Sequence, residues 1–190
     1  MVAAAAGLFT SSGYTATSLA DIAAAAGVAR PTVFAAFGSN PAPLREVLDQ
    51  ALAGDDEPVP VADRPWFQPV WVAPTQQAVL DAYAQACTLI GGRATLVFEA
   101  VRRAADASSE VSELWETQQR NRRTGAAMVI GRLETLGPIR PELTTASATD
   151  LLWIFNDPAH YGALVHHCGW PDAAFTTWLA SQMQHALLQT

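Results

Sequence analysis

Apolar residues recur every three to four positions along most of the chain, and glycine and proline divide this pattern into helix-length segments. The first part of the chain predicts four short helices, over about residues 1–11, 18–26, 29–37 and 41–52. The rest predicts longer helices, over about residues 75–90, 93–105, 109–136, 145–155, 158–168 and 171–188. Strand-like alternation is weak, and the prolines around residues 59–61 and 67–72 argue against a sheet there. The predicted fold class is therefore all-α.

One acidic, proline-rich segment, AGDDEPVPVADRP at residues 53–65, interrupts the helical pattern. This composition is typical of a linker. We therefore expect an amino-terminal domain over residues 1–52 and a helical domain over residues 66–190. Within the second domain, we interpret Gly91-Gly92-Arg93 as a break between two helices.

The composition is that of a folded protein, because 50% of the 190 residues are hydrophobic and 15% are charged. No apolar run approaches the length of a membrane span. The opening MVAAAAGLF lacks a basic leader and a convincing cleavage site, so we interpret it as a helix and expect the protein in the cytoplasm. Cys87 and Cys168 are too few for a disulfide framework and are expected to be reduced.

The segment from Thr15 to Ser39 predicts two short helices that meet at a tight turn, which is a helix-turn-helix unit. Ala23 is small enough for the helices to approach, and Gly27 tolerates the positive φ that the turn needs. Apolar residues stand where they would hold the second helix against the first: Leu19, Ile22, Val28, Val33 and Phe37. Asp21 follows Ser18 by three positions, which is the spacing of a capping box.

These residues carry a family resemblance. The stretch LFTSSGYTATSLADIAAAAGVARPTVFAAFGS resembles the head of TetR-family repressors, and Asp157-Pro158-x-x-Tyr161, Gly169-Trp170 and Trp178-Leu179 resemble the end of a subgroup of that family. The resemblance implies an amino-terminal three-helix DNA-binding domain and a carboxy-terminal helical domain for ligand binding and dimerisation. It also implies a homodimer, a palindromic double-stranded DNA operator and relief of repression by a small-molecule effector.

The resemblance also implies which residues contact DNA. Thr17 and Ser18 open the second helix, where backbone N–H groups can meet a phosphate. Four residues open the recognition helix, where base edges would be contacted: Ala29, Arg30, Pro31 and Thr32. Phe34 stands in place of a tyrosine, and Asn40 in place of a lysine, that usually contact phosphate. Arg30 is the best candidate for a bidentate contact to guanine, the alternative being that it only solvates a helix end.

The charge of the chain is unusual for a DNA-binding protein. The net charge is −7, and all eleven basic residues are arginine. Residues 1–52 hold two arginines against three carboxylates, while Phe34 lacks a hydroxyl and Asn40 lacks a charge. We therefore expect weak DNA binding by this chain. The resemblance implies an arginine-rich lead into the first helix, so we also expect a natural amino terminus that is longer than this chain. The alternative function is a ligand-binding helical dimer whose head has weak or no DNA affinity.

The helical domain holds most of the aromatic residues, some of which could line an apolar pocket with a few polar groups. The candidate ligand-binding residues are Tyr83, Cys87, Phe98, Trp115, Gln118, Arg122, Trp153, Asn156 and His160. Each of them could instead belong to the core or the surface. The neighbouring Arg120, Arg122 and Arg123 are interpreted as a solvated face paired with Glu113 and Glu116.

The last two predicted helices carry an apolar stripe that suits a four-helix dimer interface. Its members are Tyr161, Leu164, Val165, Phe175, Trp178, Leu179, Met183 and Leu187. The alternative is that the stripe packs only inside its own subunit.

Catalytic and metal motifs are missing from the sequence. There is no Ser-His-Asp arrangement with a nucleophile elbow and no phosphate loop, so we expect no enzyme activity and no cofactor. His166, His167 and Cys168 are adjacent on a helix and cannot converge on one ion, so we expect no metal. Asp157, directly before Pro158, is interpreted as a helix cap.

Overall fold

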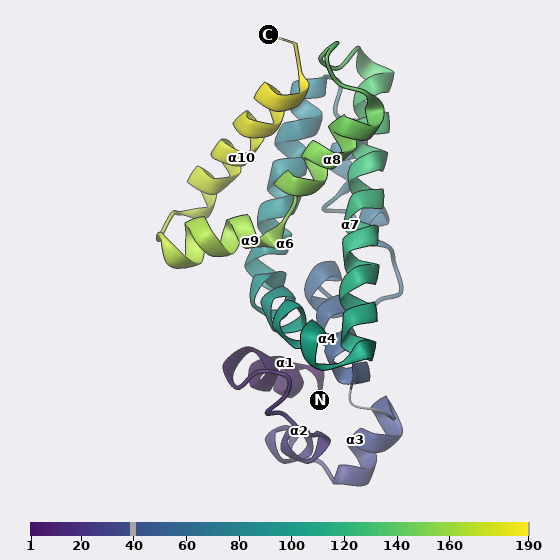
Figure 1. The fold of residues 1–190 in the computed structure, drawn as a ribbon, viewed down its shortest axis with the longest axis vertical. Coiled ribbons are helices and arrows are strands. Elements are labelled where there is room, and N and C mark those ends of the chain that lie inside the picture. Colours follow the sequence, from purple (N-terminus) through teal and green to yellow (C-terminus); the bar gives the residue numbers. More distant parts are fainter. Residues whose placement is uncertain (39–40, 190) are drawn as a thin grey trace. The chain divides into compact units, whose positions relative to one another are not determined.

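The computed structural model describes residues 1–38 and 41–189, and these residues contain helices and turns but no strand. The all-α fold class is therefore confirmed. The helices are α1 (Val2–Ser11), α2 (Leu19–Ala26), α3 (Arg30–Phe37), α4 (Pro41–Ala53), η1 (Val61–Asp63), α5 (Gln68–Val72), α6 (Gln76–Ala104), η2 (Ala105–Ala107), α7 (Ser109–Leu136), α8 (Thr145–Phe155), α9 (Pro158–Tyr161), η3 (Gly162–His167) and α10 (Asp172–Leu187) (Figure 1). No single helix in this described part is long and apolar enough to cross a membrane, although the bent pair α2 and α3 passes that test together by length and composition.

The chain forms two compact units, and α6 and α7 each contribute to both of them. The first unit comprises residues 1–56 and 93–118, and the second comprises residues 57–92 and 119–190. The first unit is thus larger than the amino-terminal domain expected at residues 1–52. The end of α6 and the start of α7 join it because their apolar residues share one core with α1, α2 and α4.

The core of the first unit lies between these helices. Phe9 of α1 and Ile22 of α2 are almost fully buried, together with Leu44 and Leu48 of α4. The α6–α7 segment adds buried Val97, Val101, Val111 and Leu114. Ile22 of α2 and Val33 of α3 belong to this core, which therefore anchors both helices.

The helix-turn-helix unit forms for the local reasons that the sequence indicates. Ser18 Oγ accepts a hydrogen bond from the Asp21 backbone N–H at 3.2 Å, and Asp21 Oδ2 accepts one from the Ser18 backbone N–H at 2.9 Å. This capping box starts α2, and Gly27 ends it in the left-handed conformation at φ 66°. The axes of α2 and α3 differ by 116°, within the range of helix-turn-helix units. The predicted turn and capping box are therefore confirmed.

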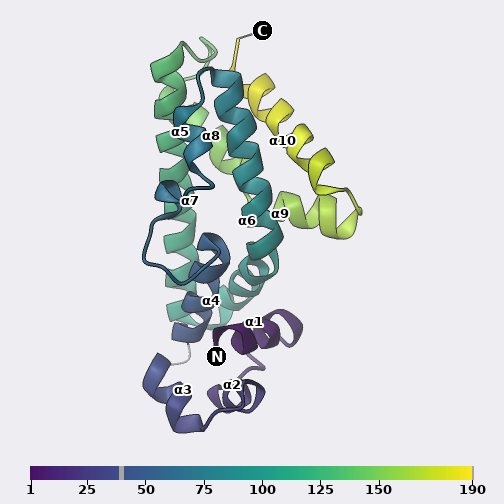
Figure 2. The same ribbon diagram turned by 180° about the vertical axis from the view of Figure 1, so that it is seen from behind.

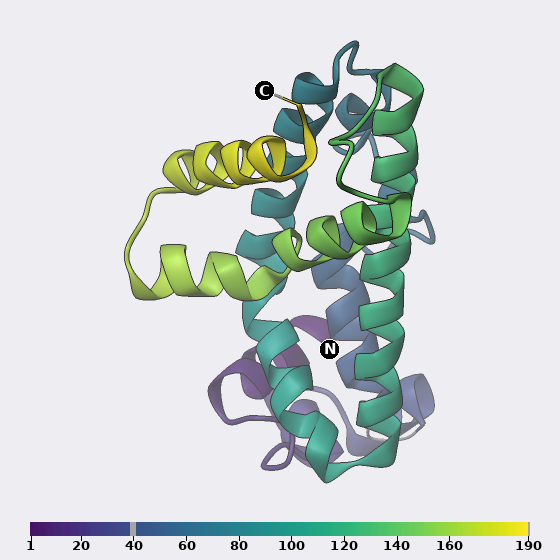
Figure 3. The same ribbon diagram turned by 45° about the horizontal axis from the view of Figure 1, so that its top comes forward.

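The second unit packs α8 and α10 against the first half of α6 and the second half of α7 (Figure 2). Its fully buried residues include Leu80, Ile130, Leu133, Leu152 and Leu179. After α9, the chain passes through the π-helical turn η3 and reverses, so that η3 and α10 lie side by side (Figure 3).

The sequence suggested that Gly91-Gly92 breaks a helix. This prediction is wrong, because α6 runs continuously from Gln76 to Ala104. A Cβ atom on Gly91 would lie 2.6 Å from Tyr161 Cγ, and one on Gly92 would lie 3.3 Å from Tyr161 Oη. The pair therefore permits the close approach of an aromatic ring to α6.

The segment expected to be a linker is folded where it enters the second unit. Arg64 is only 3% exposed, and it donates hydrogen bonds to the carbonyls of Val59 at 2.9 Å and Glu57 at 2.7 Å. Trp71 Nε1 donates to the carbonyl of Ala62 at 2.7 Å. Residues 67–72, where the prolines argued against a sheet, include the short helix α5.

Candidate nucleic-acid interface and candidate effector site

The recognition helix α3 presents its first turn to solvent. Val33 is fully buried and anchors the helix, whereas Ala29, Arg30, Pro31 and Thr32 are all exposed. The structure therefore places the four candidate base-contacting residues at the surface. Phe34 is also exposed, at 62% of its surface. Asn40, the remaining candidate on this side, lies outside the described residues.

The two candidate phosphate contacts at the start of α2 are already engaged within the protein. Thr17 is 3% exposed, and its Oγ1 donates to the carbonyl of Gly13 at 2.8 Å. Ser18 Oγ donates to Asp21 Oδ2 at 2.7 Å, and this bond and the Ser18 backbone N–H lower the pKa of the Asp21 carboxyl. A phosphate that approached the backbone N–H groups at the start of α2 would therefore meet the Asp21 carboxylate, which accepts from the Ser18 N–H at 2.9 Å.

The first unit carries twice as many acidic residues as arginines. The arginines are Arg30, Arg45, Arg93, Arg102 and Arg103, and the acidic residues are Asp21, Glu46, Asp49, Asp55, Asp56, Glu99, Asp106, Glu110, Glu113 and Glu116. Glu99 pairs with Arg102 at 2.7 Å and with Arg103 at 2.6 Å, which lowers the pKa of its carboxyl. Arg93 donates to the carbonyl of Ala53 at the end of α4. Within α3, Arg30 is the residue whose positive charge could contact DNA.

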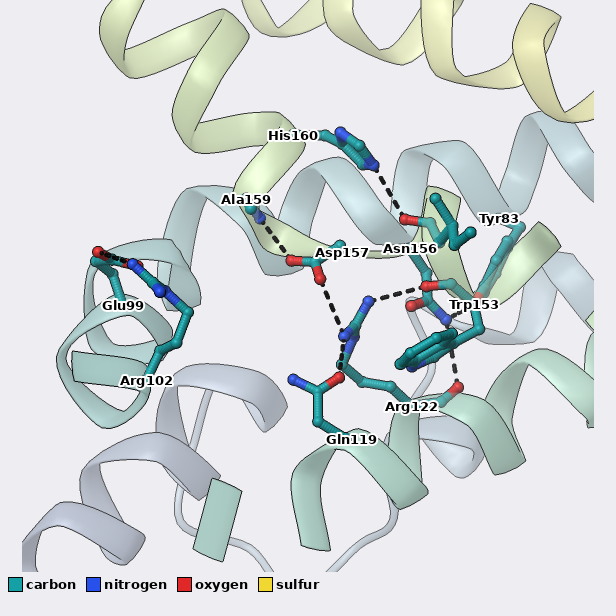
Figure 4. Close-up of polar contacts among 11 residues, drawn as sticks. Tyr83, Glu99, Arg102, Gln119, Arg122, Trp153, Asn156, Asp157, Ala159 and His160 are labelled. Carbon is teal, nitrogen blue, oxygen red and sulfur yellow. Dashed lines mark hydrogen bonds and ion pairs between the residues drawn. The ribbon is translucent and has the colours of Figure 1, made fainter. Parts of the chain in front are cut away.

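A polar cluster inside the second unit centres on Arg122 of α7 (Figure 4). The Arg122 side chain is 9% exposed, and its Nη1 lies 3.2 Å from Asp157 Oδ2 and 2.6 Å from Gln119 Oε1. Its Nη2 donates to the carbonyl of Trp153 at 2.9 Å, and the guanidinium lies 5.7 Å from the centre of the Trp153 ring. Burial lowers the pKa of Arg122, and the Asp157 carboxylate opposes this shift.

This geometry corrects the interpretation of the three neighbouring arginines as one solvated face. Arg123 is exposed and pairs with Asp150 at 2.7 Å, as a surface arginine would. Arg122 instead points into the second unit, towards the junction of α8 and α9. Asp157 acts there as the predicted cap of α9, because its Oδ1 accepts from the Ala159 N–H at 2.9 Å. Nothing in the sequence indicated that its other oxygen pairs with Arg122.

Tyr83 and Cys87 of α6 extend the cluster. Asn156 Nδ2 donates to Tyr83 Oη at 2.9 Å and lies 3.3 Å from the carbonyl of Arg122. Burial raises the pKa of Tyr83. Burial also raises the pKa of Cys87 to about 12, against the opposing effect of Arg122. Both side chains are therefore neutral at physiological pH, and the charges in the cluster are those of Arg122 and Asp157.

Among the buried polar atoms of this cluster, Trp153 Nε1 and Asn156 Oδ1 have no hydrogen-bond partner in the described part of the chain. The first is a donor and the second an acceptor. Leaving such atoms unpaired costs about 1–3 kcal/mol each, so native structures rarely do so without a reason. A small ligand could accept a hydrogen bond from Trp153 Nε1 and donate one to Asn156 Oδ1.

The candidate ligand-binding residues fall into two groups, one in each unit. Tyr83, Cys87, Arg122, Trp153 and Asn156 lie in the cluster, and His160 lies near it with its Nε2 3.0 Å from the carbonyl of Ile154. The other three candidates, Phe98, Trp115 and Gln118, belong to the first unit. There Phe98 and Trp115 pack edge to face at 5.6 Å, and Gln118 is buried. Gln119 and Asp157 were missed as members of the cluster.

The structure also places the predicted dimer stripe. Five of its members are buried inside their own subunit: Tyr161, Phe175, Leu179, Met183 and Leu187. They expose almost no surface to a second copy, which favours the alternative that these five pack inside the subunit. Leu164, Val165 and Trp178 are half-buried. Trp170, which packs edge to face on Trp178 at 6.3 Å, is 37% exposed.

Comparisons with known proteins place this geometry in a family context. Residues 1–40 match the model of bacterial regulatory proteins of the tetR family. No curated protein matches the chain in sequence.

Solved structures match almost the whole chain. A protein from Rhodococcus sp. assigned to the TetR-family transcriptional regulators has a TM-score of 0.71 at 12% identity, covering 97% of this chain and 94% of its own. One assigned to the same family from Shewanella sp. PV-4 has a TM-score of 0.68 at 20% identity, covering 100% and 96%. The ketosteroid transcriptional regulator KstR2 of Mycobacterium tuberculosis has a TM-score of 0.61 at 16% identity, covering 100% and 93%. At these identities the likeness is one of fold.

Proposed function

We propose that this chain, whose residues 1–40 match the tetR family of bacterial regulatory proteins, is a repressor that a small-molecule effector releases from a palindromic operator. The observation that carries the proposal is the α2–turn–α3 unit, which presents Arg30 in the exposed first turn of the recognition helix. An arginine there can donate two hydrogen bonds to guanine O6 and N7. In this proposal the protein acts on DNA in the cytoplasm and catalyses no reaction.

The operator would be palindromic because the proposed repressor is a homodimer. The half-buried Leu164, Val165 and Trp178 and the exposed Trp170 supply apolar surface for a second copy at η3 and α10. The five stripe residues buried in the subunit are not part of this proposed interface. In such a dimer, two recognition helices would enter successive major grooves about 34–36 Å apart.

The effector would bind at the Arg122 cluster of the second unit. Trp153 Nε1 can donate to the effector, and Asn156 Oδ1 can accept from it. Since Asp157 already pairs with Arg122, the cluster has no net charge to attract an ion, and a neutral polar effector suits it best. Binding would favour the conformation in which the two recognition helices no longer match the operator.

The test is selection of DNA sequences from a random library by the full-length chain at low salt, followed by gel-shift titration of Arg30→Ala. The bidentate contact to guanine is worth about 1–3 kcal/mol, so the variant should bind about 5–150-fold more weakly per half-site while its melting temperature stays unchanged. Arg45→Ala is the matched control, because Arg45 is an exposed arginine of α4 in the same unit. Equal binding by Arg30→Ala and the parent chain would contradict the role of Arg30.

The second candidate function is a ligand-binding helical dimer whose head has little or no DNA affinity. The excess of acidic residues in the first unit favours it, and so does the carboxylate at the start of α2. Selection that enriches no sequence at low salt would support this second function and reject the first.

A further inference from the structure

One exposed face of α3 carries a single charged side chain, and its other members are apolar. Arg30, Pro31, Phe34 and Ala35 fall within about 140° of each other around the helix, since successive residues are about 100° apart. Val33, on the other side, is fully buried. Phe34 is therefore the large side chain on the exposed face, and it stands one turn after Arg30 on the same side.

A phenyl ring at this position cannot contact DNA phosphate in the way that a tyrosine does, because it has no donor. Phosphate oxygens are strongly hydrated, and pressing a ring against them removes water without replacing its hydrogen bonds. The ring gains free energy only where it meets another apolar surface. In the major groove of DNA, the apolar group on the base edges is the C5 methyl of thymine.

We infer that Phe34 selects thymine in the operator by packing its exposed ring on the C5 methyl group. The inference rests on the proposed function, since it requires α3 to enter the major groove. Arg30 and Phe34 are four residues apart, which is about 6 Å along the helix axis. This distance corresponds to about two base steps, so the thymine lies within about two base pairs of the guanine that Arg30 contacts.

The rest of the face supports recognition through methyl contacts. Pro31 and Ala35 have no side-chain donor or acceptor, so neither can distinguish bases by hydrogen bonds. Both are small and exposed, and they leave the ring of Phe34 accessible to a base edge. Sequence specificity on this face then depends on one charged contact and one apolar contact in each half-site.

The experiment uses the full-length chain and the operator obtained by selection. Each thymine is replaced in turn by uracil, which removes only the C5 methyl, and dissociation constants are measured for the parent chain and for Phe34→Ala. One thymine per half-site should be sensitive, with about fourfold weaker binding per half-site when its methyl is lost, as expected for one methyl-sized group. In Phe34→Ala the same replacement should have no effect, which is the signature of a direct contact in a double-mutant cycle.

Phe34→Tyr is the matched variant, because it keeps the ring and adds a hydroxyl. It should keep the sensitivity to uracil. If the ring instead lies on the DNA backbone, Phe34→Tyr will strengthen binding to all sequences and no uracil replacement will matter, which overturns the inference while leaving the proposed function intact. Selection that enriches no DNA sequence overturns both.

Discussion

The close approach of Tyr161 to α6 predicts opposite effects for alanine at two helical glycines of the second unit. Gly91 faces the Tyr161 ring, and a Cβ there would lie 2.6–2.8 Å from three atoms of that side chain. Gly131 lies on the exposed side of α7, and its Cβ would meet nothing within 4 Å. The two substitutions are chemically identical, so they separate the helix-forming tendency of alanine from its size.

The magnitudes follow from these contacts. Replacing glycine by alanine inside a helix stabilises it by up to about 1 kcal/mol, and Gly131→Ala should show this gain. At Gly91 the gain is offset by overpacking, which costs about 1–3 kcal/mol. The ring cannot easily move away, because Tyr161 Oη donates to Asp172 Oδ1 at 2.7 Å and the ring packs on Phe175 with 5.3 Å between centroids. Gly91→Ala should therefore be up to about 2 kcal/mol less stable than the parent chain.

Thermal unfolding followed by circular dichroism can measure this difference. For a chain of this size about 2–4 °C corresponds to 1 kcal/mol, so Gly91→Ala should melt several degrees below Gly131→Ala. Gly92→Ala should fall between them, because its Cβ would lie 3.3 Å from the end of the Tyr161 side chain. The packing argument is refuted if Gly91→Ala melts as high as Gly131→Ala.

Two further predictions concern other contacts of the second unit. Asp157→Asn keeps a cap for α9 but removes the charge that faces the buried guanidinium of Arg122. The free energy of unfolding measured in urea should fall by about 1–2 kcal/mol. This loss is smaller than for a fully buried ion pair, because the carboxylate is 35% exposed. Asp157→Ala should cost about 1 kcal/mol more through the lost cap, and equal stabilities of the two variants would contradict the double role. Burial and the hydrogen bond to Asp172 raise the pKa of Tyr161 to about 12, so its contribution to stability is present below about pH 10 and is lost as pH rises towards 12. Tyr161→Phe should lose stability less steeply over this pH range, and a parent chain equally stable at pH 10 and pH 12 would count against this assignment.

The elements that the sequence predicted well are those specified by neighbouring residues. The start of α2 depends on Ser18 and Asp21, and its end depends on Gly27, so all the necessary information lies within ten positions. The bounds of α7 and α8 also match the apolar pattern. The interruption predicted at Gly91 was wrong because the reason for this glycine is a ring far along the chain. A glycine that breaks a helix and one that admits a ring look the same in sequence.

The candidate site shows the same limit. Arg122 and Arg123 have nearly identical sequence surroundings, but helix phase directs the first towards the α8–α9 junction and the second to solvent. The sequence predicted Asp157 as a cap, yet it could not show that the second carboxylate oxygen holds Arg122. Likewise, an amphipathic stripe indicates which residues must be buried, but not whether a neighbouring helix or a second subunit buries them.

The charge and the surface of α3 together determine what kind of DNA binder this chain can be. Affinity for random DNA comes mainly from neutralised phosphates, and a unit with twice as many acidic residues as arginines gains little from them. Contacts to base edges do not depend on that balance, and each mismatched base pair costs about 1–3 kcal/mol. The ratio of specific to non-specific affinity can therefore stay high while both affinities are low. For such a protein, the base contacts proposed for Arg30 and Phe34 would matter more to specificity than an equal number of added phosphate contacts, because phosphate contacts strengthen the correct and the incorrect complexes alike.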